Sequence, residues 1–280
     1  MTRRRGVLLA TGALVLVAVV GVAAWATRPD GGNDTAAASP GPHNGRFHVE
    51  CGYSHSAPDD PIVFPGEPGA SHRHDFFGAS STDAFSDAES LLAGDTTCAT
   101  KQDKASYWAP SLFAGDEQIE PLGSTAYYRA ADGVDPAAVE PFPFGLMMIS
   151  GDPTATVTQP TEHVGWACTV EAPTSSTPPD CQRTLLLRVI FPDCWDGDHL
   201  DSEDHRSHVA RSTADGCPDT HPVALPQLEF HVRYPPPESR ADLHLASGSI
   251  LTAHADFFNA WDPAKLANEV QVCIGEDAYC

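Results

Sequence analysis

Basic side chains are scarce in this chain of 280 residues. It holds 16 Lys and Arg against 38 Asp and Glu, which gives a formal net charge of −22. A chain this acidic repels a phosphate backbone instead of neutralising it, so nucleic-acid binding is excluded as a function. Only 19% of the residues are charged against 41% that are hydrophobic, and this composition also excludes a disordered protein.

Several catalytic signatures are missing as well. The chain has no G-x-S-x-G elbow, P-loop, dinucleotide G-x-G-x-x-G, H-E-x-x-H helix or C-x-x-C pair. Their absence argues against a serine hydrolase, a nucleotide enzyme, a zincin protease and a cysteine zinc site. Long helical stretches are also lacking, because 22 Gly and 25 Pro divide the chain into short elements joined by turns.

The N-terminus has the pattern of an export signal. Three arginines precede an uncharged apolar run, so residues 1–26 are a signal peptide or an N-terminal membrane anchor. Both forms place the rest of the chain outside the cell, either secreted or anchored to the outer face of the cytoplasmic membrane. Residues 27–45 are small and polar and predict a flexible linker, and residues 46–280 predict one folded domain.

The cysteines agree with export. All eight lie in the exported part, where an oxidising compartment makes disulfide bonds the default. Eight cysteines allow 105 pairings, so the sequence leaves the connectivity open. Closeness along the chain favours Cys168 with Cys181, Cys194 with Cys217, and Cys273 with Cys280, which leaves Cys51 with Cys98 by elimination.

Short apolar runs bounded by Pro or Gly predict a mainly β fold. They cover residues 47–51, 61–64, 144–149, 184–191 and 225–234, and the last of them alternates apolar with polar residues as a half-buried strand does. Helices are expected only at 81–92 and 262–271. The pattern predicts a single β-sandwich or jelly-roll-like domain with long disulfide-pinned loops and few short helices.

Histidine is unusually frequent, with 13 residues, and several lie beside carboxylates. In an extended segment His72 and His74 would share one face, with Asp75 opposite. An imidazole beside a carboxylate serves in proton transfer near neutral pH. The candidate catalytic residues are therefore the histidines and acids of three segments: His74, Asp75, His205, His208, His254 and Asp256.

Neutral imidazole also binds zinc or copper, so a divalent metal is a second use of the same residues. The metal would be held by His72, His74 and one of His205, His208 or His254, with His208 as the working choice. Four aromatic residues are candidates for stacking on sugar rings: Tyr107, Trp108, Trp195 and Trp261.

An ordered set of motifs resembles one known family. The set includes Pro-Ile-Val-Phe-Pro-Gly at 61–66, Gly-Ala-Ser-His-Arg-His-Asp-Phe-Phe-Gly at 69–78, Tyr-Trp-Ala-Pro at 107–110, the 194–208 segment, and His-Ala-Asp-Phe-Phe-Asn-Ala-Trp at 254–261. It is similar to the DUF1996 family, whose members are secreted and in fungi are often joined to WSC carbohydrate-binding modules. The resemblance implies an extracellular, wall- or polysaccharide-associated role. It places seven residues in family motifs and leaves their roles open: His72, His74, Asp75, His205, His208, His254 and Asp256.

Three hypotheses follow. The first is a secreted or surface-tethered enzyme that cleaves a cell-wall or extracellular polysaccharide by His/Asp acid–base chemistry, as a hydrolase or lyase. The second is a non-catalytic protein that binds a wall glycan. The third is an extracellular protein with a histidine-bound copper or zinc ion. In each of them contact with a membrane is limited to the N-terminal segment.

Overall fold

The computed structural model describes residues 45–239 and 242–280. The expected export segment at 1–26 and the expected linker, apart from Gly45, lie outside the described residues. Those that are described fall within one compact unit. Within these two ranges, no helix has the length and apolar character needed to cross a membrane.

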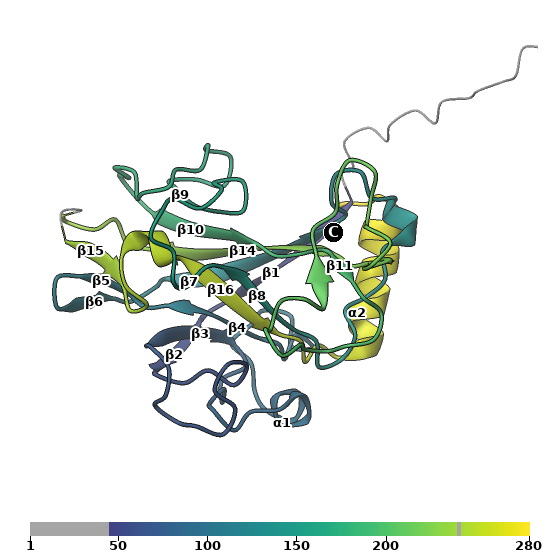
Figure 1. Ribbon diagram of the computed structural model, residues 1–280, viewed down its shortest axis with the longest axis horizontal. Helices are drawn as coiled ribbons and strands as arrows, with labels where there is room; N and C mark the ends of the chain where they lie inside the picture. Colours follow the sequence, from purple (N-terminus) through teal and green to yellow (C-terminus); the bar gives the residue numbers. More distant parts are fainter. Residues whose placement is uncertain (1–44, 240–241) are drawn as a thin grey trace, which may run out of the picture. The chain divides into compact units, whose positions relative to one another are not determined.

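One five-stranded antiparallel sheet, called sheet A here, contains the longest strand (Figure 1). Its strands are ordered β1 (Arg46–Cys51), β7 (Gly123–Arg129), β14 (Gln227–Tyr234), β10 (Leu185–Ile190) and β9 (Val164–Ala167). Strand β1 alternates between exposed and buried residues, because one face of the sheet meets the core and the other meets solvent.

A second five-stranded antiparallel sheet, sheet B, carries most of the sequence motifs. Its strands are ordered β2 (Tyr53–Ala57), β3 (His74–Gly78), β4 (Ser106–Pro110), β16 (His254–Phe258) and β8 (Met147–Gly151). The strands β3, β4, β16 and β8 contain almost no exposed residue, which shows that sheet B is covered on both faces.

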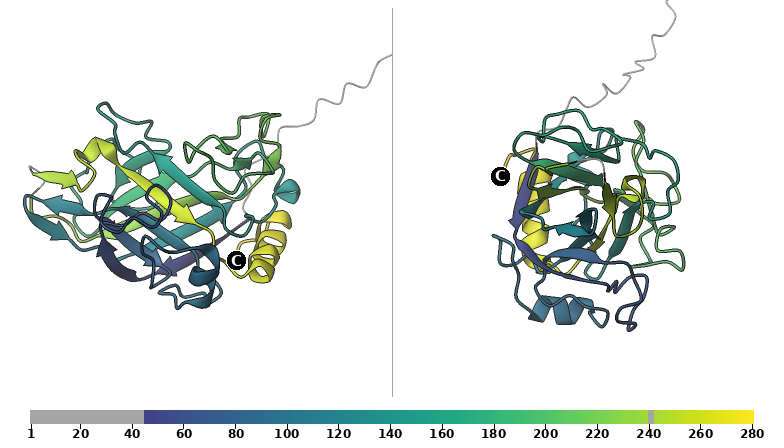
Figure 2. Two further views of the ribbon diagram at one scale, coloured as in Figure 1. Left: turned by 60° about the horizontal axis from the view of Figure 1, so that its bottom comes forward. Right: turned by 90° about the vertical axis from the view of Figure 1, so that its left-hand side faces the viewer.

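The two sheets pack face to face, and Figure 2 shows them from two further directions. Aromatic rings from both sheets meet in the core between them: Tyr107 of β4 stacks on Phe230 of β14 with centroids 5.4 Å apart, and Phe77 of β3 meets the same ring at 5.8 Å. Burial of this shared apolar surface stabilises the sandwich.

A smaller apolar cluster covers the outer face of sheet B. It joins Phe76, Trp108 and Phe258 of the sheet to Ile62 and Leu91 of the segment between β2 and β4. That segment includes α1 (Ala88–Ala93), which Figure 1 shows on the outer side of β2 and β3. Asp87 caps this helix by accepting the N–H of Ser90, so the helix begins later than the 81–92 expected from the sequence.

The remaining elements are short. Two three-stranded sheets have the orders β12 (Val209–Ala210), β11 (Cys194–Trp195), β13 (Val223–Ala224) and β15 (Leu243–Leu245), β5 (Leu112–Ala114), β6 (Glu117–Ile119). The helical turns are η1 (Pro136–Ala138), η2 (Ile250–Thr252), α2 (Pro263–Glu269) and the π-helical η3 (Val270–Gly275). Helix α2 begins after Asp262 with Pro263 in its first turn, as expected.

The expected mainly β, sandwich-like fold with few short helices and long disulfide-pinned loops is confirmed. Its four disulfides are the pairs predicted from closeness in sequence and elimination: Cys51–Cys98, Cys168–Cys181, Cys194–Cys217 and Cys273–Cys280. One expected strand is wrong. Residues 61–64 form a turn, because the carboxylate of Asp60 accepts the N–H groups of Ile62 and Val63.

Candidate metal centre

Three histidines meet on the outer face of sheet B. His74 lies on β3 and His254 on β16, with β4 between them, and His72 directly precedes β3. The ring centroid of His72 lies 4.2 Å from that of His74 and 5.1 Å from that of His254. One ring nitrogen from each of the three lies within 4.8 Å of the other two. We call this group the histidine centre.

Backbone carbonyls orient two of the imidazoles. The Nδ1 atom of His74 lies 2.9 Å from the carbonyl oxygen of Asp59, and that of His254 lies 2.7 Å from the carbonyl oxygen of Thr252. Because a carbonyl can only accept, each Nδ1 donates its hydrogen and each Nε2 carries a lone pair. Second partners of this kind are what orient metal-binding histidines.

The Nε2 atoms face one another. Those of His72 and His254 are 3.2 Å apart, and that of His74 is buried with no hydrogen-bond partner among the described residues. Ligand nitrogens at about 2.05 Å from a tetrahedral zinc ion are about 3.3 Å apart, so the observed spacing suits a metal.

Burial keeps these imidazoles neutral. His74 is 0% exposed and His254 is 3% exposed. Burial lowers the pKa of His254 to about 3, and burial together with the neighbouring His72 and His254 lowers the pKa of His74 well below its usual value. Burial also lowers the pKa of His72. Neutral imidazole is the form that binds a metal.

A cavity of about 250 Å³ borders the centre. It touches His72 and His254 and is lined by two carboxyl groups, those of Asp60 and Asp256. The Oδ2 atom of Asp256 lies 4.0 Å from Nε2 of His254 and has no hydrogen-bond partner in the described ranges. Burial, with Asp60 nearby, raises the pKa of Asp256 well above its usual value. The rest of the wall includes Val63, Phe64, Ile149 and Pro153.

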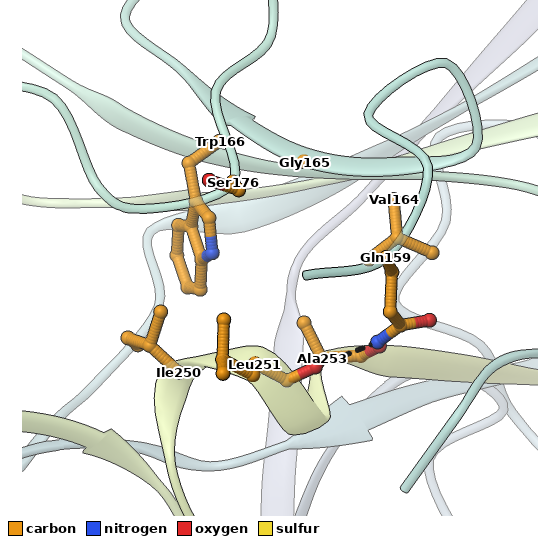
Figure 3. A pocket seen from close by; sticks show the side chains of 8 residues that line it. All are labelled: Gln159, Val164, Gly165, Trp166, Ser176, Ile250, Leu251 and Ala253. Carbon is orange, nitrogen blue, oxygen red and sulfur yellow. Dashed lines mark hydrogen bonds between the residues drawn. The ribbon is translucent and has the colours of Figure 1, made fainter. Parts of the chain in front are cut away.

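Two residues hold the backbone beside His254. Gly151 of β8 is paired with His254 and has φ +92°, and a Cβ at this position would lie 2.7 Å from the Cα of His254. The side-chain amide of Gln159 donates to the carbonyl oxygens of Leu251 and Ala253 at 2.7 and 2.8 Å (Figure 3). Its oxygen accepts the N–H of Asp152 at 2.9 Å, so Gln159 ties the β8 end to the turn before His254.

Strand alternation turns the neighbours of His74 away from the centre. Asp75 lies on the other side of the sheet, where its Oδ1 accepts from Ser56, Ser111 and Gln118. His74 and Asp75 therefore cannot act together on one substrate atom. The guanidinium of Arg73 donates to Gln118 at 3.0 Å, and this removes a cation that would otherwise repel a metal.

The 201–208 loop lies next to β8 but does not supply a third ligand. Both ring nitrogens of His208 are engaged, with the carbonyl oxygen of Met147 at 2.7 Å and the hydroxyl of Ser202 at 2.9 Å. The working choice of His208 as a metal ligand is therefore replaced by His254. Arg206 donates to the carbonyl oxygen of Gly151 at 2.8 Å and fixes the loop on the same strand.

His205 lies near the cavity. Its Nδ1 is 2.9 Å from a carboxylate oxygen of Asp201. Burial raises the pKa of Asp60 in the cavity wall, and the nearby His205 acts in the opposite direction. The backbone of His205 has φ 56°, a left-handed conformation that is uncommon outside glycine and often marks functional positions. Of the two candidates in the 201–208 loop, His205 is therefore the one that lies near the cavity.

The aromatic candidates do not form a binding wall. Tyr107 and Trp108 are 0% exposed and Trp261 is 1% exposed, so no sugar ring can stack on them. Trp108 lies beneath the histidine centre, with its ring centroid 6.5 Å from that of His74. Trp195 is partly buried, and its indole N–H donates to the carbonyl oxygen of His199.

Sequence reasoning missed Asp60, Gly151 and Gln159, which lie in none of the histidine segments. The tertiary fold brings these three residues to the histidine centre, and no local sequence pattern marks them. Two other groups of potential ligands occur among the described residues, Cys51/Cys98/Asp103 and Glu269/Cys273/Cys280. Their cysteines are joined in disulfides and provide no thiolate, so the histidine centre is the only one of the three groups that suits a metal.

A family model described as domain of unknown function, DUF1996, matches residues 60–261, which include all three histidines of the centre. Neither the curated proteins nor the solved structures give a match to this chain. Because the matched range covers well over half of its 280 residues, the chain belongs to the DUF1996 family.

Proposed function

We propose that this protein is an extracellular metalloenzyme whose histidine centre binds one zinc or copper ion and acts on a polysaccharide. The observation that carries the proposal is the convergence of three imidazole nitrogens within 4.8 Å, two of them on rings that backbone carbonyls orient. Three histidine ligands and a fourth position for water or substrate are the arrangement of catalytic zinc sites.

The cavity beside the centre supports a hydrolytic reaction. A zinc ion held by His72, His74 and His254 would lower the pKa of a bound water to about 7 and so supply a nucleophile. Asp256 lines the cavity, and its unpaired Oδ2 lies 4.0 Å from Nε2 of His254, where it could accept a hydrogen bond from that water. Apolar side chains in the cavity wall would strengthen these interactions by lowering the local polarity.

His205, which lies near Asp60 of the cavity wall, is a candidate for proton transfer to a leaving group. Asp201 holds one ring nitrogen, which leaves the other for exchange of a proton. The loop that carries it is pinned by Cys194–Cys217 and by Arg206 on β8.

The proposed location and substrate class rest on other features. Four disulfides suit an oxidising compartment outside the cell. The basic and apolar N-terminal residues have the pattern of an export segment. A wall polysaccharide is the substrate class that agrees with this location.

Metal analysis of the untagged protein tests the proposal. We expect zinc or copper near one ion per chain, and loss of that ion in His72→Ala and His254→Ala. His199→Ala is the matched control, because His199 is exposed and its partner is Asp196. Release of reducing ends from wall polysaccharides should stop on chelation and return with the metal. Protein that binds neither ion when dialysed against each would overturn the proposal.

Acid–base hydrolysis without a metal is a second candidate. It is favoured by the 4.0 Å approach of Asp256 to His254 within the same cavity. Activity that survives complete metal removal and is lost in Asp256→Asn would support this alternative over the metalloenzyme.

A further inference from the structure

The chemistry of the histidine centre indicates which bond of a polysaccharide it hydrolyses, and this inference rests on the proposed metal. A metal ion polarises a carbonyl oxygen and supplies a nucleophilic water. A glycosidic bond has no carbonyl group, and enzymes usually cleave it with a pair of carboxyl groups that flank the bond. An acyl ester on a sugar hydroxyl has the carbonyl group that such a centre can activate.

The two carboxyl groups of the cavity differ in their surroundings. Asp60 accepts the N–H groups of Ile62 and Val63 at 3.0 and 3.1 Å, so one of its oxygens holds the turn at 61–64. Asp256 has a buried oxygen with no hydrogen-bond partner in the described part of the chain, 4.0 Å from Nε2 of His254. Asp256 is therefore the carboxyl placed to act beside the histidines, whereas glycoside cleavage takes a pair.

The cavity beside the centre is small. Its volume of about 250 Å³ lies below the range of about 300–1,000 Å³ that is usual for the sites of drug-sized ligands. It therefore has room for a substituent of a few atoms and little room for two joined sugar rings. Because His72 and His254 line the cavity, a group inside it lies beside the proposed metal ligands.

Much of the cavity wall is apolar. The apolar side chains come from the turn at 61–64, from β8 and from the segment after β8: Val63, Phe64, Ile149 and Pro153. A methyl group is stabilised by contact with such side chains. Sugar hydroxyls pressed against them would lose hydrogen bonds to water without replacing them. The wall therefore favours the methyl group of an acetyl substituent over a sugar ring.

We propose that the bond which the histidine centre hydrolyses most readily is an acetyl ester on a polysaccharide hydroxyl. The methyl group lies in the cavity, and the sugar chain stays outside it. Water adds to the carbonyl carbon, the bond from this carbon to the sugar oxygen breaks, and the sugar oxygen takes up a proton. The products are acetate, the free sugar hydroxyl and one proton, so the reaction needs no oxidant or reductant.

The zinc-loaded, full-length protein tests this proposal on O-acetylated xylan, with acetate and reducing ends measured in the same samples. We expect acetate to form faster than reducing ends. Val63 lines the cavity and is 38% exposed, so Val63→Trp should obstruct entry and slow acetate release about tenfold or more. Val170→Trp is the matched control, because Val170 also lies in a turn, is 43% exposed and does not line the cavity.

Val63→Ala tests the fit of the acyl group without adding a larger side chain. It widens the cavity, so hydrolysis of p-nitrophenyl butyrate relative to p-nitrophenyl acetate should rise about tenfold, the usual order for one or two methylene groups in an apolar pocket. A general loss of structure would lower both rates together. An unchanged ratio at full zinc content would overturn the role of the cavity.

The zinc content of each protein separates this proposal from the proposed function. Zinc near one ion per chain, with reducing ends released and no acetate, would overturn the ester and leave the metalloenzyme. Equal acetate release by Val63→Trp and Val170→Trp at equal zinc content would overturn the cavity as the acyl site. A parent protein that binds no zinc would overturn this inference, and one that binds neither zinc nor copper would overturn the proposed function as well.

Discussion

Asp103 shows how a single buried acid links charge to stability. It is 0% exposed, and its Oδ2 accepts from the hydroxyl of Tyr107 at 2.9 Å. The hydroxyls of Tyr107 and Tyr128 are hydrogen-bonded, and the indole N–H of Trp261 donates to Tyr128. Tyr107 and Trp261 thus belong to a buried polar chain in the core, which is why they are unavailable to a sugar.

The pH dependence of stability should change in Asp103→Asn. Burial raises the pKa of Asp103 from 3.8 to about 8, so between these values the unfolded state binds fewer protons than the folded state. The contribution of Asp103 is therefore fully present below about pH 4 and is lost as the pH rises to about 8. We expect the melting temperature of the parent to fall more steeply between pH 5 and pH 8 than that of Asp103→Asn. Parallel curves for the two proteins would contradict this assignment.

Individual histidines were only partly predictable. Alternation along an extended segment correctly separates His74 from Asp75, because it is a local property of a strand. The choice of His254 over His208 depends on β3 and β16 flanking β4, which brings His254 to His72 across a sequence separation of 182 residues. No local pattern contains that pairing, and both candidates lie beside acids.

At the scale of the element, the pairing of the end of β8 with the start of β16 positions the backbone of His254. The two strands are paired at Gly151 and His254, and Gln159 joins the backbone on both sides of this pair. The approach is so close that a Cβ on Gly151 would lie 2.5 Å from the carbonyl oxygen of Ala253. Glycine is required here both for its positive φ and for space.

Gly151→Ala should lower the affinity of the histidine centre for a metal. The added methyl group must displace the His254 backbone, and the centre would lose its spacing. Gly216→Ala is a matched control, because Gly216 has φ +91° but its nearest contact to a Cβ would be 3.6 Å away. We expect metal affinity to fall about tenfold or more for Gly151→Ala only, the order seen when the support of a ligand is disturbed. Equal metal affinity in the two variants, measured with a competing chelator, would contradict this role.

The elements themselves were predictable where the pattern is long. The strands β10 and β14 fall within the apolar runs at 184–191 and 225–234, and α2 starts at its proline. The turn at 61–64 has the same apolar content as a short strand, and only the carboxylate of Asp60 distinguishes it. The sequence also did not predict that the chain on either side of β3, within residues 58–95, covers the outer face of sheet B. Alternation along a strand does not show whether its second face is buried.

On the scale of the whole molecule, the disulfides close loops of very different length. Cys51–Cys98 spans 47 residues and joins the end of β1 in sheet A to the chain that leads into β4 of sheet B. Cys194–Cys217, Cys168–Cys181 and Cys273–Cys280 span 23, 13 and 7 residues. A disulfide stabilises mainly by restricting the unfolded chain, and more so for longer loops.

Replacing each cysteine pair by serine should therefore lower stability in the order of loop length. The loop-closure relation gives losses of about 4 kcal/mol for Cys51–Cys98, about 3 for the two intermediate pairs and about 2 for Cys273–Cys280. Urea unfolding of the four double variants measures this order. A larger loss for Cys273–Cys280 than for Cys51–Cys98 would show that native packing around the sulfur atoms outweighs chain entropy.

The histidine centre lies on the outer side of sheet B, across the sandwich from the outer face of sheet A. Two packed sheets separate these surfaces, each sheet spaced about 10 Å from the other. A strand of polymer lying along one surface has to bend around an edge before it reaches the other.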